Sequence, residues 1–241
     1  MTLTRRSFLK CAGIGAMSLS FGGVLSACSS GSAPKASASV TGNADEVVVS
    51  MTTSSEPAAG FDPLFSWGCG EHVHEPLIQS TLITTDKDLN FVNDLATDYS
   101  CSKDGLTWTF TIRDDVKFTD GQPLTARDVA FTINGINENA AAEADLSMVK
   151  KAVAVSDTVV ELHLNKPFNA LLYTLAVVGI VPEHAYDSAS YGANPIGSGR
   201  YMLEQWDRGQ QVILKANPDY YGEAPLMKRV IVVFMEEDAS L

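Results

Sequence analysis

The sequence has few cysteines, a shortage of positive charge and no apolar run long enough to cross a membrane. Four cysteines among 241 residues do not make the disulfide framework of a small secreted domain. Lysine and arginine total 17 against 29 aspartate and glutamate residues. This excess of negative charge argues against binding to nucleic acid, whose phosphates require basic patches, and disfavours direct binding to anionic lipid. The apolar run at residues 11–25 is too short and too rich in Gly, Ala and Ser to span a bilayer.

Motifs of common enzyme classes are also absent. Gly-Ser-Gly at residues 197–199 is not the Gly-x-Ser-x-Gly turn of hydrolases, and His-Val-His-Glu at residues 72–75 is not the His-Glu-x-x-His of zinc proteases. A glycine-rich phosphate loop is missing too. We therefore expect no enzymatic activity and no bound cofactor. The alternative, an exported enzyme such as a surface hydrolase, needs a nucleophile and a base brought together by the fold.

The N-terminal residues carry two export patterns. Arg5 and Arg6 precede Phe-Leu-Lys, which is typical of a twin-arginine signal. Leu-Ser-Ala-Cys at residues 25–28 resembles a bacterial lipobox, in which Cys28 is lipidated and becomes the first mature residue. An ordinary secretory signal with a chance cysteine is the alternative. We predict a signal peptide at residues 1–27 and a lipid-anchored protein of the cell envelope, either on the outer face of the cytoplasmic membrane or periplasmic.

The composition changes twice after the signal. Residues 28–45 are rich in Ser, Ala and Gly and cannot build a core, so they are predicted to form a flexible tether. From residue 46 onward the composition is that of a globular body. Strand patterns, several joined by hairpin turns, occur at residues 46–51, 99–102, 107–113, 152–155, 158–164, 200–206, 211–216 and 229–235. They predict an α+β fold with mainly antiparallel pairing.

Helical patterns are fewer. Thr125 has an acidic residue three positions later, which predicts a capped helix whose apolar side is Val129, Ile133 and Ile136. A second helix is expected over residues 167–173. A third is expected to begin at His72 and to run toward residue 79, interrupted by Pro76.

Several motifs of this body resemble the family 5 extracellular solute-binding proteins, the peptide- and nickel-binding lipoproteins of ABC importers. WTFTIRDDVKFTDGQPLTARDV at residues 108–129 looks like the family signature. Pro-Ile-Gly-Ser-Gly-Arg-Tyr at residues 195–201 and Asn-Pro-Asp-Tyr-Tyr-Gly at residues 217–222 are similar to two further motifs. Phe-Asp-Pro at residues 61–63 and His-Glu-Pro-Leu at residues 74–77 fit its early segments, although the family usually has an aromatic residue where His74 stands.

The resemblance implies a periplasmic-binding-protein-like fold of class II, cluster C type, with mixed and largely antiparallel sheets. Residues 46–241 are expected to form the N-terminal lobe, with a subdomain inserted at about residues 58–188. Family members have two lobes that close over a ligand. The second lobe is missing from this sequence, which therefore resembles a truncated member. A fragment without a transport role is the alternative.

The implied function is that of a substrate-binding lipoprotein that captures peptides or a nickel chelate for an ABC permease complex. Its contact with the membrane is expected through the lipid anchor only. A single lobe is expected to bind ligand weakly or not at all, because association costs on the order of 4–15 kcal/mol and half a site supplies only part of the contacts.

The family also suggests where a ligand would lie, because residues 56–71 border its interlobe cleft. The candidates are Glu56, Trp67, Gly68 and Cys69. Glu56 is expected to meet a ligand ammonium group and Trp67 to pack over it, although Trp67 as a simple core anchor is the alternative. Gly197 and Gly199 are expected to adopt a positive φ and to permit close backbone approach.

Cys69, His72 and His74 carry the chemistry of soft-metal ligands. A structural zinc site normally needs four protein ligands, and no second cluster completes one, so no metal site is predicted. Cys69 and Cys101 are expected as free thiols, because twin-arginine substrates usually fold in a reducing compartment. A disulfide between them is the alternative outside the cytoplasm.

Overall fold

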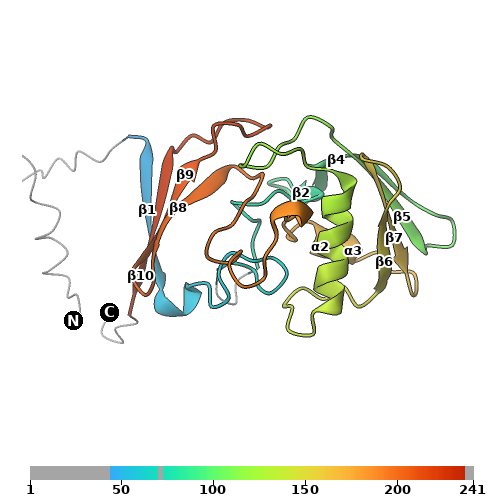
Figure 1. Ribbon diagram of the computed structural model, residues 1–241, viewed down its shortest axis with the longest axis horizontal. Helices are drawn as coiled ribbons and strands as arrows, with labels where there is room; N and C mark the ends of the chain where they lie inside the picture. The colour runs from blue at the N-terminus through green and yellow to red at the C-terminus, as the bar shows by residue number, and fades with distance from the viewer. Residues whose placement is uncertain (1–43, 70–72, 237–241) are drawn as a thin grey trace, which may run out of the picture. The chain divides into compact units, whose positions relative to one another are not determined.

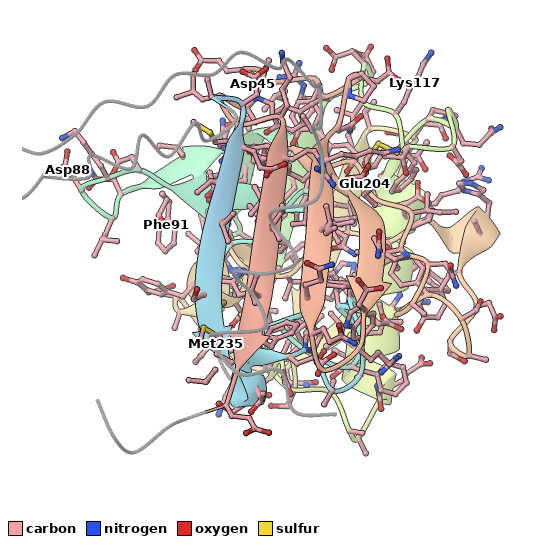
Figure 2. All side chains as sticks on the ribbon, turned by 90° about the vertical axis from the view of Figure 1, so that its left-hand side faces the viewer. Asp45, Asp88, Phe91, Lys117, Glu204 and Met235 are labelled. Carbon is pink, nitrogen blue, oxygen red and sulfur yellow. The ribbon has the colours of Figure 1, made fainter. Side chains whose placement is uncertain are left out.

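Four strands from the two ends of the globular body form one sheet. The computed structural model describes residues 44–69 and 73–236, which all belong to one unit, Gly42–Leu241. Its first sheet, called here the β1 sheet, contains β1 (Glu46–Thr52), β10 (Arg229–Met235), β9 (Gln211–Ala216) and β8 (Tyr201–Asp207) in that order. Figure 2 shows these four strands side by side. β1 is parallel to β10, and the other pairs are antiparallel.

A second four-stranded sheet lies between β1 and β8 in the sequence. This β5 sheet contains β4 (Ala96–Cys101), β5 (Thr107–Ile112), β7 (Val159–Leu164) and β6 (Val149–Ala154), all antiparallel (Figure 1). β2 (Ile83–Thr85) and β3 (Phe91–Asn93) pair with each other in a separate two-stranded sheet. The predicted strands are confirmed, and so is a mixed fold with largely antiparallel sheets and few helices.

The core of the β5 sheet follows from the alternation of its central strand. Trp108, Phe110 and Ile112 are buried, whereas Thr111 between the last two is exposed. Such a period of two places every second side chain on the same face. The buried face packs in one cluster with the apolar side of α2 (Ala126–Glu138), the principal helix of the described residues. Figure 1 shows α2 beside β6, and the two elements are in contact.

Helix α2 begins at the predicted cap. The Oγ1 atom of Thr125 accepts a hydrogen bond from the Arg127 amide at 3.3 Å, and the Asp128 carboxylate accepts one from the Thr125 amide at 2.8 Å. This reciprocal capping box satisfies amides that the helix itself leaves unpaired. The predicted apolar side, Val129, Ile133 and Ile136, is buried as expected.

Of the two remaining helix predictions, the one near residue 170 is confirmed in part and the one at residues 72–79 is wrong. α3 (Leu171–Leu175) overlaps the helix predicted at residues 167–173, but it begins later, after Ala170, and ends two residues beyond it. The third prediction is wrong for the residues that are described, because residues 73–79 contain no helix. Pro76 has no amide hydrogen to donate within a helix. The neighbouring carbonyls instead accept hydrogen bonds from elsewhere: the amide of Tyr201 donates to Leu77 at 2.9 Å and that of Gly199 to Ile78 at 2.8 Å.

Short 3₁₀ turns complete the described elements, η1 (Thr53–Ser55) and η2 (Glu183–Ala185). Within residues 44–69 and 73–236, the helices are all too short or too polar to cross a bilayer. Arg5, Arg6, Cys28 and His72 lie outside the described residues, so the predicted signal peptide, most of the tether and one metal candidate remain predictions.

Gly197 and Gly199 owe their place to close packing and not to unusual dihedral angles. Neither has the positive φ that the sequence suggested. A Cβ atom at Gly197 would lie 2.0 Å from the carbonyl oxygen of Ile78, and one at Gly199 would lie 2.5 Å from that of Leu77. Real Cβ atoms do not come so near to backbone atoms. The expectation of close backbone approach is therefore confirmed, and that of positive φ is wrong.

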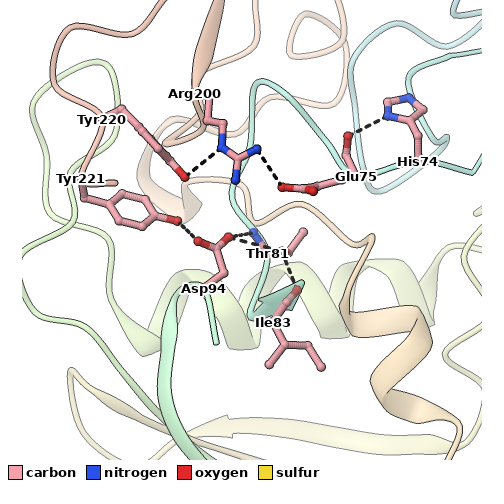
Figure 3. Close-up of polar contacts among 8 residues, drawn as sticks. All are labelled: His74, Glu75, Thr81, Ile83, Asp94, Arg200, Tyr220 and Tyr221. Atoms are coloured by element: carbon pink, nitrogen blue, oxygen red, sulfur yellow. Dashed lines mark hydrogen bonds and ion pairs between the residues drawn. The ribbon is translucent and has the colours of Figure 1, made fainter. Parts of the chain in front are cut away.

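A polar junction fastens the β9–β10 connection to the segment after β3 (Figure 3). The Tyr221 hydroxyl donates to Asp94 at 2.5 Å, and the Thr81 amide donates to the same carboxylate at 3.2 Å. The Arg113 guanidinium lies 4.9 Å from the centre of the Tyr221 ring. Burial raises the pKa of Tyr221, and the neighbouring Asp94 charge raises it further, so the phenol stays protonated and keeps donating.

Asp94→Asn should lower the free energy of unfolding by about 1–2 kcal/mol, because a charge-assisted hydrogen bond from Tyr221 becomes a neutral one. Denaturant unfolding measures the change. Asp88→Asn is the matched control, since Asp88 is exposed and forms an ion pair with the equally exposed Lys87. Equal effects of the two substitutions would contradict the importance given to this junction.

Candidate functional site

A cavity of about 360 Å³ lies between one face of the β1 sheet and the connection from β1 to β2. The sheet contributes alternate side chains, because residues that share a face recur every second position. In β10 these are Val230, Val232 and Phe234. Val49 of β1 is paired with Val232, and Met51 with Phe234, which places their side chains on the same face.

The other wall comes mainly from loops. The described residues of the β1–β2 connection that line the cavity are Ser55, Pro57, Phe61, Pro63, Ser66, Trp67, Gly68, Cys69, His74, Pro76, Leu77, Ile78 and Gln79. Among all the described lining residues, none is aspartate, glutamate, lysine or arginine. A concave site of this size, apolar with a few polar atoms, is of the kind that takes small molecules.

The loop wall is held by a buried polar network. Asp62 lies between the lining residues Phe61 and Pro63 and is 2% exposed. Its carboxylate accepts hydrogen bonds from the Leu64 amide and from the Tyr186 hydroxyl, each at 2.9 Å. Burial raises the pKa of Asp62, and these two hydrogen bonds partly offset the rise.

Gln79 extends this support on the neighbouring segment. Its side-chain amide donates to the Phe61 carbonyl at 3.0 Å and to the Tyr191 hydroxyl at 3.2 Å. Tyr191 in turn donates to the Ile196 carbonyl at 2.7 Å. Because Phe61 and Gln79 both line the cavity, the network fixes the shape of its loop wall.

Three of the four ligand candidates lie together in this wall. Trp67, Gly68 and Cys69 all line the cavity. Trp67 is half-buried and also packs against the main core, which supports the core-anchor alternative, and its packing over a ligand remains a prediction. Gly68 has a φ of 75°, which turns the chain at this point. Burial raises the pKa of the Cys69 thiol, which donates to the Met51 sulfur at 3.9 Å.

Glu56 is placed differently. Its carboxylate accepts a hydrogen bond from the Trp206 indole at 2.9 Å and one from the Gly209 amide at 2.8 Å. Arg208 stacks over the Trp206 ring, with 4.1 Å between its guanidinium carbon and the ring centre. This geometry gives Glu56 a structural role at the β8–β9 turn. Its expected contact with a ligand ammonium group remains a prediction.

The described residues hold no group of three or more His, Cys, Asp and Glu side chains arranged for a metal ion. Cys69 and Cys101 are free thiols, as predicted. The Nδ1 atom of His74 lies 2.8 Å from the carbonyl oxygen of Glu75, as Figure 3 shows. Its Nε2 atom is buried and has no hydrogen-bond partner among the described residues.

Sequence reasoning missed the sheet side of the cavity. Val49, Val212 and Val232 look like ordinary core residues in the sequence, because an apolar strand does not show which of its faces borders an opening.

Comparison with known proteins decides the family. Residues 90–241, more than half of the chain, match the bacterial extracellular solute-binding proteins, family 5, middle region. The chain belongs to this family. Its members are binding proteins of transport systems and not enzymes, and its relatives are periplasmic or extracellular.

Three similar proteins illustrate the range of the family. The chain is 38% identical over 157 residues to the probable D,D-dipeptide-binding periplasmic protein DdpA of Escherichia coli, covering 61% of this chain and 30% of DdpA. NikZ of Campylobacter jejuni, solved with Ni(L-His), is 27% identical with a TM-score of 0.71, covering 80% of this chain and 40% of NikZ. The oligopeptide-binding protein AppA of Bacillus subtilis, solved with a nonapeptide, is 28% identical with a TM-score of 0.67, covering 79% and 40%. The chain thus spans well under half the length of these relatives.

Proposed function

We propose that this chain takes part in capturing a small solute, a peptide or a nickel chelate, for an ABC permease. The cavity beside Trp67, Gly68 and Cys69 is the observation that carries the proposal, because it offers a concave, mostly apolar site in a member of a solute-binding family. Relatives named for dipeptide binding and solved with a nonapeptide or with Ni(L-His) support the two solute classes.

The proposal includes the arrangement of the chain. Residues 46–241 act as the N-terminal lobe of a solute-binding domain, and residues 58–188 as a subdomain inserted into it. The β1 sheet and the loops over it then form one side of a ligand site. Because the chain spans 40% of NikZ and of AppA, we expect it to supply only part of the contacts that such proteins make with a ligand.

Binding by the purified chain tests this function. The full chain carrying Cys28→Ala avoids detergent, which would compete for an apolar cavity. Titration by NMR with short peptides and with the nickel–histidine complex should show saturable binding weaker than micromolar, since the association cost is retained while contacts are few. Trp67→Ala should weaken this binding, whereas Trp206→Phe, near the end of β8 and outside the cavity lining, should change it less. Absence of binding by every peptide and by the nickel complex would contradict the proposal.

We also propose a twin-arginine lipoprotein anchored through Cys28. The support is the order of Arg5, Arg6 and the lipobox in the sequence. Cys28→Ala should shift the protein from the membrane fraction to the soluble fraction of the cell envelope, because two or more acyl chains are needed for stable anchoring and the variant carries none. Immunoblotting of the separated fractions measures this. A variant that still sediments with membranes as the wild type does would refute the anchor.

A further inference from the structure

The two four-stranded sheets differ in how their outer strands are protected. An edge strand presents unpaired N–H and C=O groups along one side, and these can pair with another chain. The edges are β1 and β8 in the β1 sheet, and β4 and β6 in the β5 sheet. Each of β8, β4 and β6 has a register shift against its neighbour and an exposed charged residue, namely Glu204, Asp98 and Lys151. Bulges and charges of this kind hinder the addition of a further strand.

β1 has neither form of protection. It pairs with β10 without a register shift from Glu46 to Thr52, and the residues after Glu46 carry no charge. Val48 is 55% exposed and Val49 is 39% exposed, and as adjacent residues of a strand they lie on opposite faces. Among the described strands, none pairs with the outer side of β1, and Figure 2 shows it at the border of the sheet. An uncharged edge of seven residues is suited to receive a further strand.

The sequence of β1 is complementary to itself. In an antiparallel pair of two copies about a twofold axis at Val49, Val47 lies opposite Met51, Val48 opposite Ser50, and Val49 opposite the partner's Val49. These side chains are all uncharged, and valine packs well across paired strands. Such a pair presents the same strand from each copy, so it closes after two copies.

The charge at the end of β1 favours this direction of pairing. In the antiparallel pair Glu46 faces the uncharged Thr52, and the two Glu46 carboxylates lie about 20 Å apart at a rise of about 3.4 Å per residue. That separation exceeds the screening length of about 8–10 Å at ordinary ionic strength. A parallel pair in register would set the two Glu46 side chains next to each other. A second copy in the antiparallel direction therefore fits the edge without like-charge repulsion.

We propose that β1 is an interface for a second copy of this chain, and that two β1 sheets join there into one sheet of eight strands. The local twofold axis of an antiparallel pair is perpendicular to the sheet, so the faces that border the two cavities lie on the same side. Val49 lines the cavity, and the partner's Val49 would lie beside its edge. The inference goes beyond the proposed function, because the pairing requires no solute.

Sedimentation velocity of the full chain carrying Cys28→Ala tests the interface. A reducing agent keeps Cys69 and Cys101 as free thiols, so covalent dimers do not interfere. This chain should show a monomer–dimer equilibrium, with a dimer fraction that rises with concentration. Adding Val49→Lys sets two like charges directly opposite each other, and it should raise the dissociation constant of the dimer at least about tenfold.

Two comparisons separate pairing through β1 from a general effect of charge. Val155→Lys introduces the same charge at a valine that is 58% exposed and lies just after β6, and it should leave the dissociation constant unchanged. Val49→Glu should dissociate the dimer as Val49→Lys does. A mixture of the two Val49 variants should form dimers again, because lysine then faces glutamate across the axis. Mixing would not repair a damaged fold, and circular dichroism of each variant should match that of the Cys28→Ala chain.

Four results would overturn the inference. The first is a Cys28→Ala chain that stays monomeric at every soluble concentration, and the second is assembly that continues beyond two copies. The third is a dimer that Val49→Lys leaves intact, or that does not return in the mixture, since another surface would then join the copies. The fourth is equal weakening by Val155→Lys and Val49→Lys. The proposed capture of a solute would stand in each case, because its test does not depend on a dimer.

Discussion

Replacing Gly197 with alanine should lower the free energy of unfolding by about 3 kcal/mol or more. The new methyl group would lie 2.0 Å from the Ile78 carbonyl oxygen and 2.7 Å from its carbon, both of which are backbone atoms. No side-chain rotation relieves that overlap, so the two segments must separate. Their separation weakens the hydrogen bond from the Gly199 amide to Ile78, now 2.8 Å long.

Denaturant unfolding of Gly197→Ala is to be compared with that of Gly121→Ala. Gly121 has a φ of 87° and nothing within 4 Å of an added Cβ, so its substitution should cost only about 1–2 kcal/mol of dihedral strain. Leu77 and Ile78 line the cavity, and the Gly197 variant should therefore also lose peptide binding. A loss of stability no larger than that of Gly121→Ala would show that the two segments yield easily.

Asp62→Ala should cost about 2–4 kcal/mol at neutral pH. It removes the carboxylate that accepts two hydrogen bonds, so the Leu64 amide and the Tyr186 hydroxyl lose their acceptor next to the buried Asp62 position. Asp114→Ala, at an exposed aspartate close to the β5 sheet, should change the unfolding free energy by less than about 0.5 kcal/mol. Similar losses for the two variants would contradict the assigned role of Asp62.

The raised pKa of Asp62 gives the same residue a pH signature. Between its ordinary pKa of 3.8 and the higher folded value, the folded state binds more protons than the unfolded state. The contribution of Asp62 to the free energy of unfolding is therefore fully present below pH 3.8, and it is lost as the pH rises through the pKa of Asp62 in the folded state. Asp62→Asn cannot ionise, so the wild type should lose stability relative to this variant as pH increases from 4 to 7. A difference that is constant over this range would contradict the raised pKa.

Local patterns in the sequence predicted local structure well. The alternation of Trp108, Phe110 and Ile112 gave the central strand of the β5 sheet, and Thr125 with Asp128 gave the start of α2. The cap depends on two residues three positions apart. The alternation of the strand can be recognised in the sequence without knowing that β7 is its partner.

The failures arose where distant segments meet. Gly197 resembled a turn glycine, but the reason for it is the carbonyl of Ile78, over a hundred residues earlier. For Glu56 the ligand contact remains a prediction, but the sequence did not reveal its hydrogen bonds from Trp206 in β8 and from Gly209 in the turn after it. Residues 73–79 lack a helix because Pro76 has no amide hydrogen, and because the amides of Gly199 and Tyr201 donate to the carbonyls of Ile78 and Leu77. The loop half of the cavity could be predicted from family motifs, whereas its sheet half required the register of β1 with β10.

The central claim is that a solute enters the cavity between the β1 sheet and the loop at Trp67. Alkylation of Cys69 and Cys101, the free cysteines of the part of the chain that the structure describes, tests it most directly. Cys69 lines the cavity, whereas Cys101 is exposed at the end of β4. The rate of reaction of each thiol with N-ethylmaleimide, followed by mass spectrometry of the separate peptides, is measured with and without Ala-Phe-Ala. We predict that saturating peptide slows the reaction of Cys69 severalfold and leaves that of Cys101 unchanged. An unchanged rate at Cys69, under conditions where the peptide is bound, would contradict the claim.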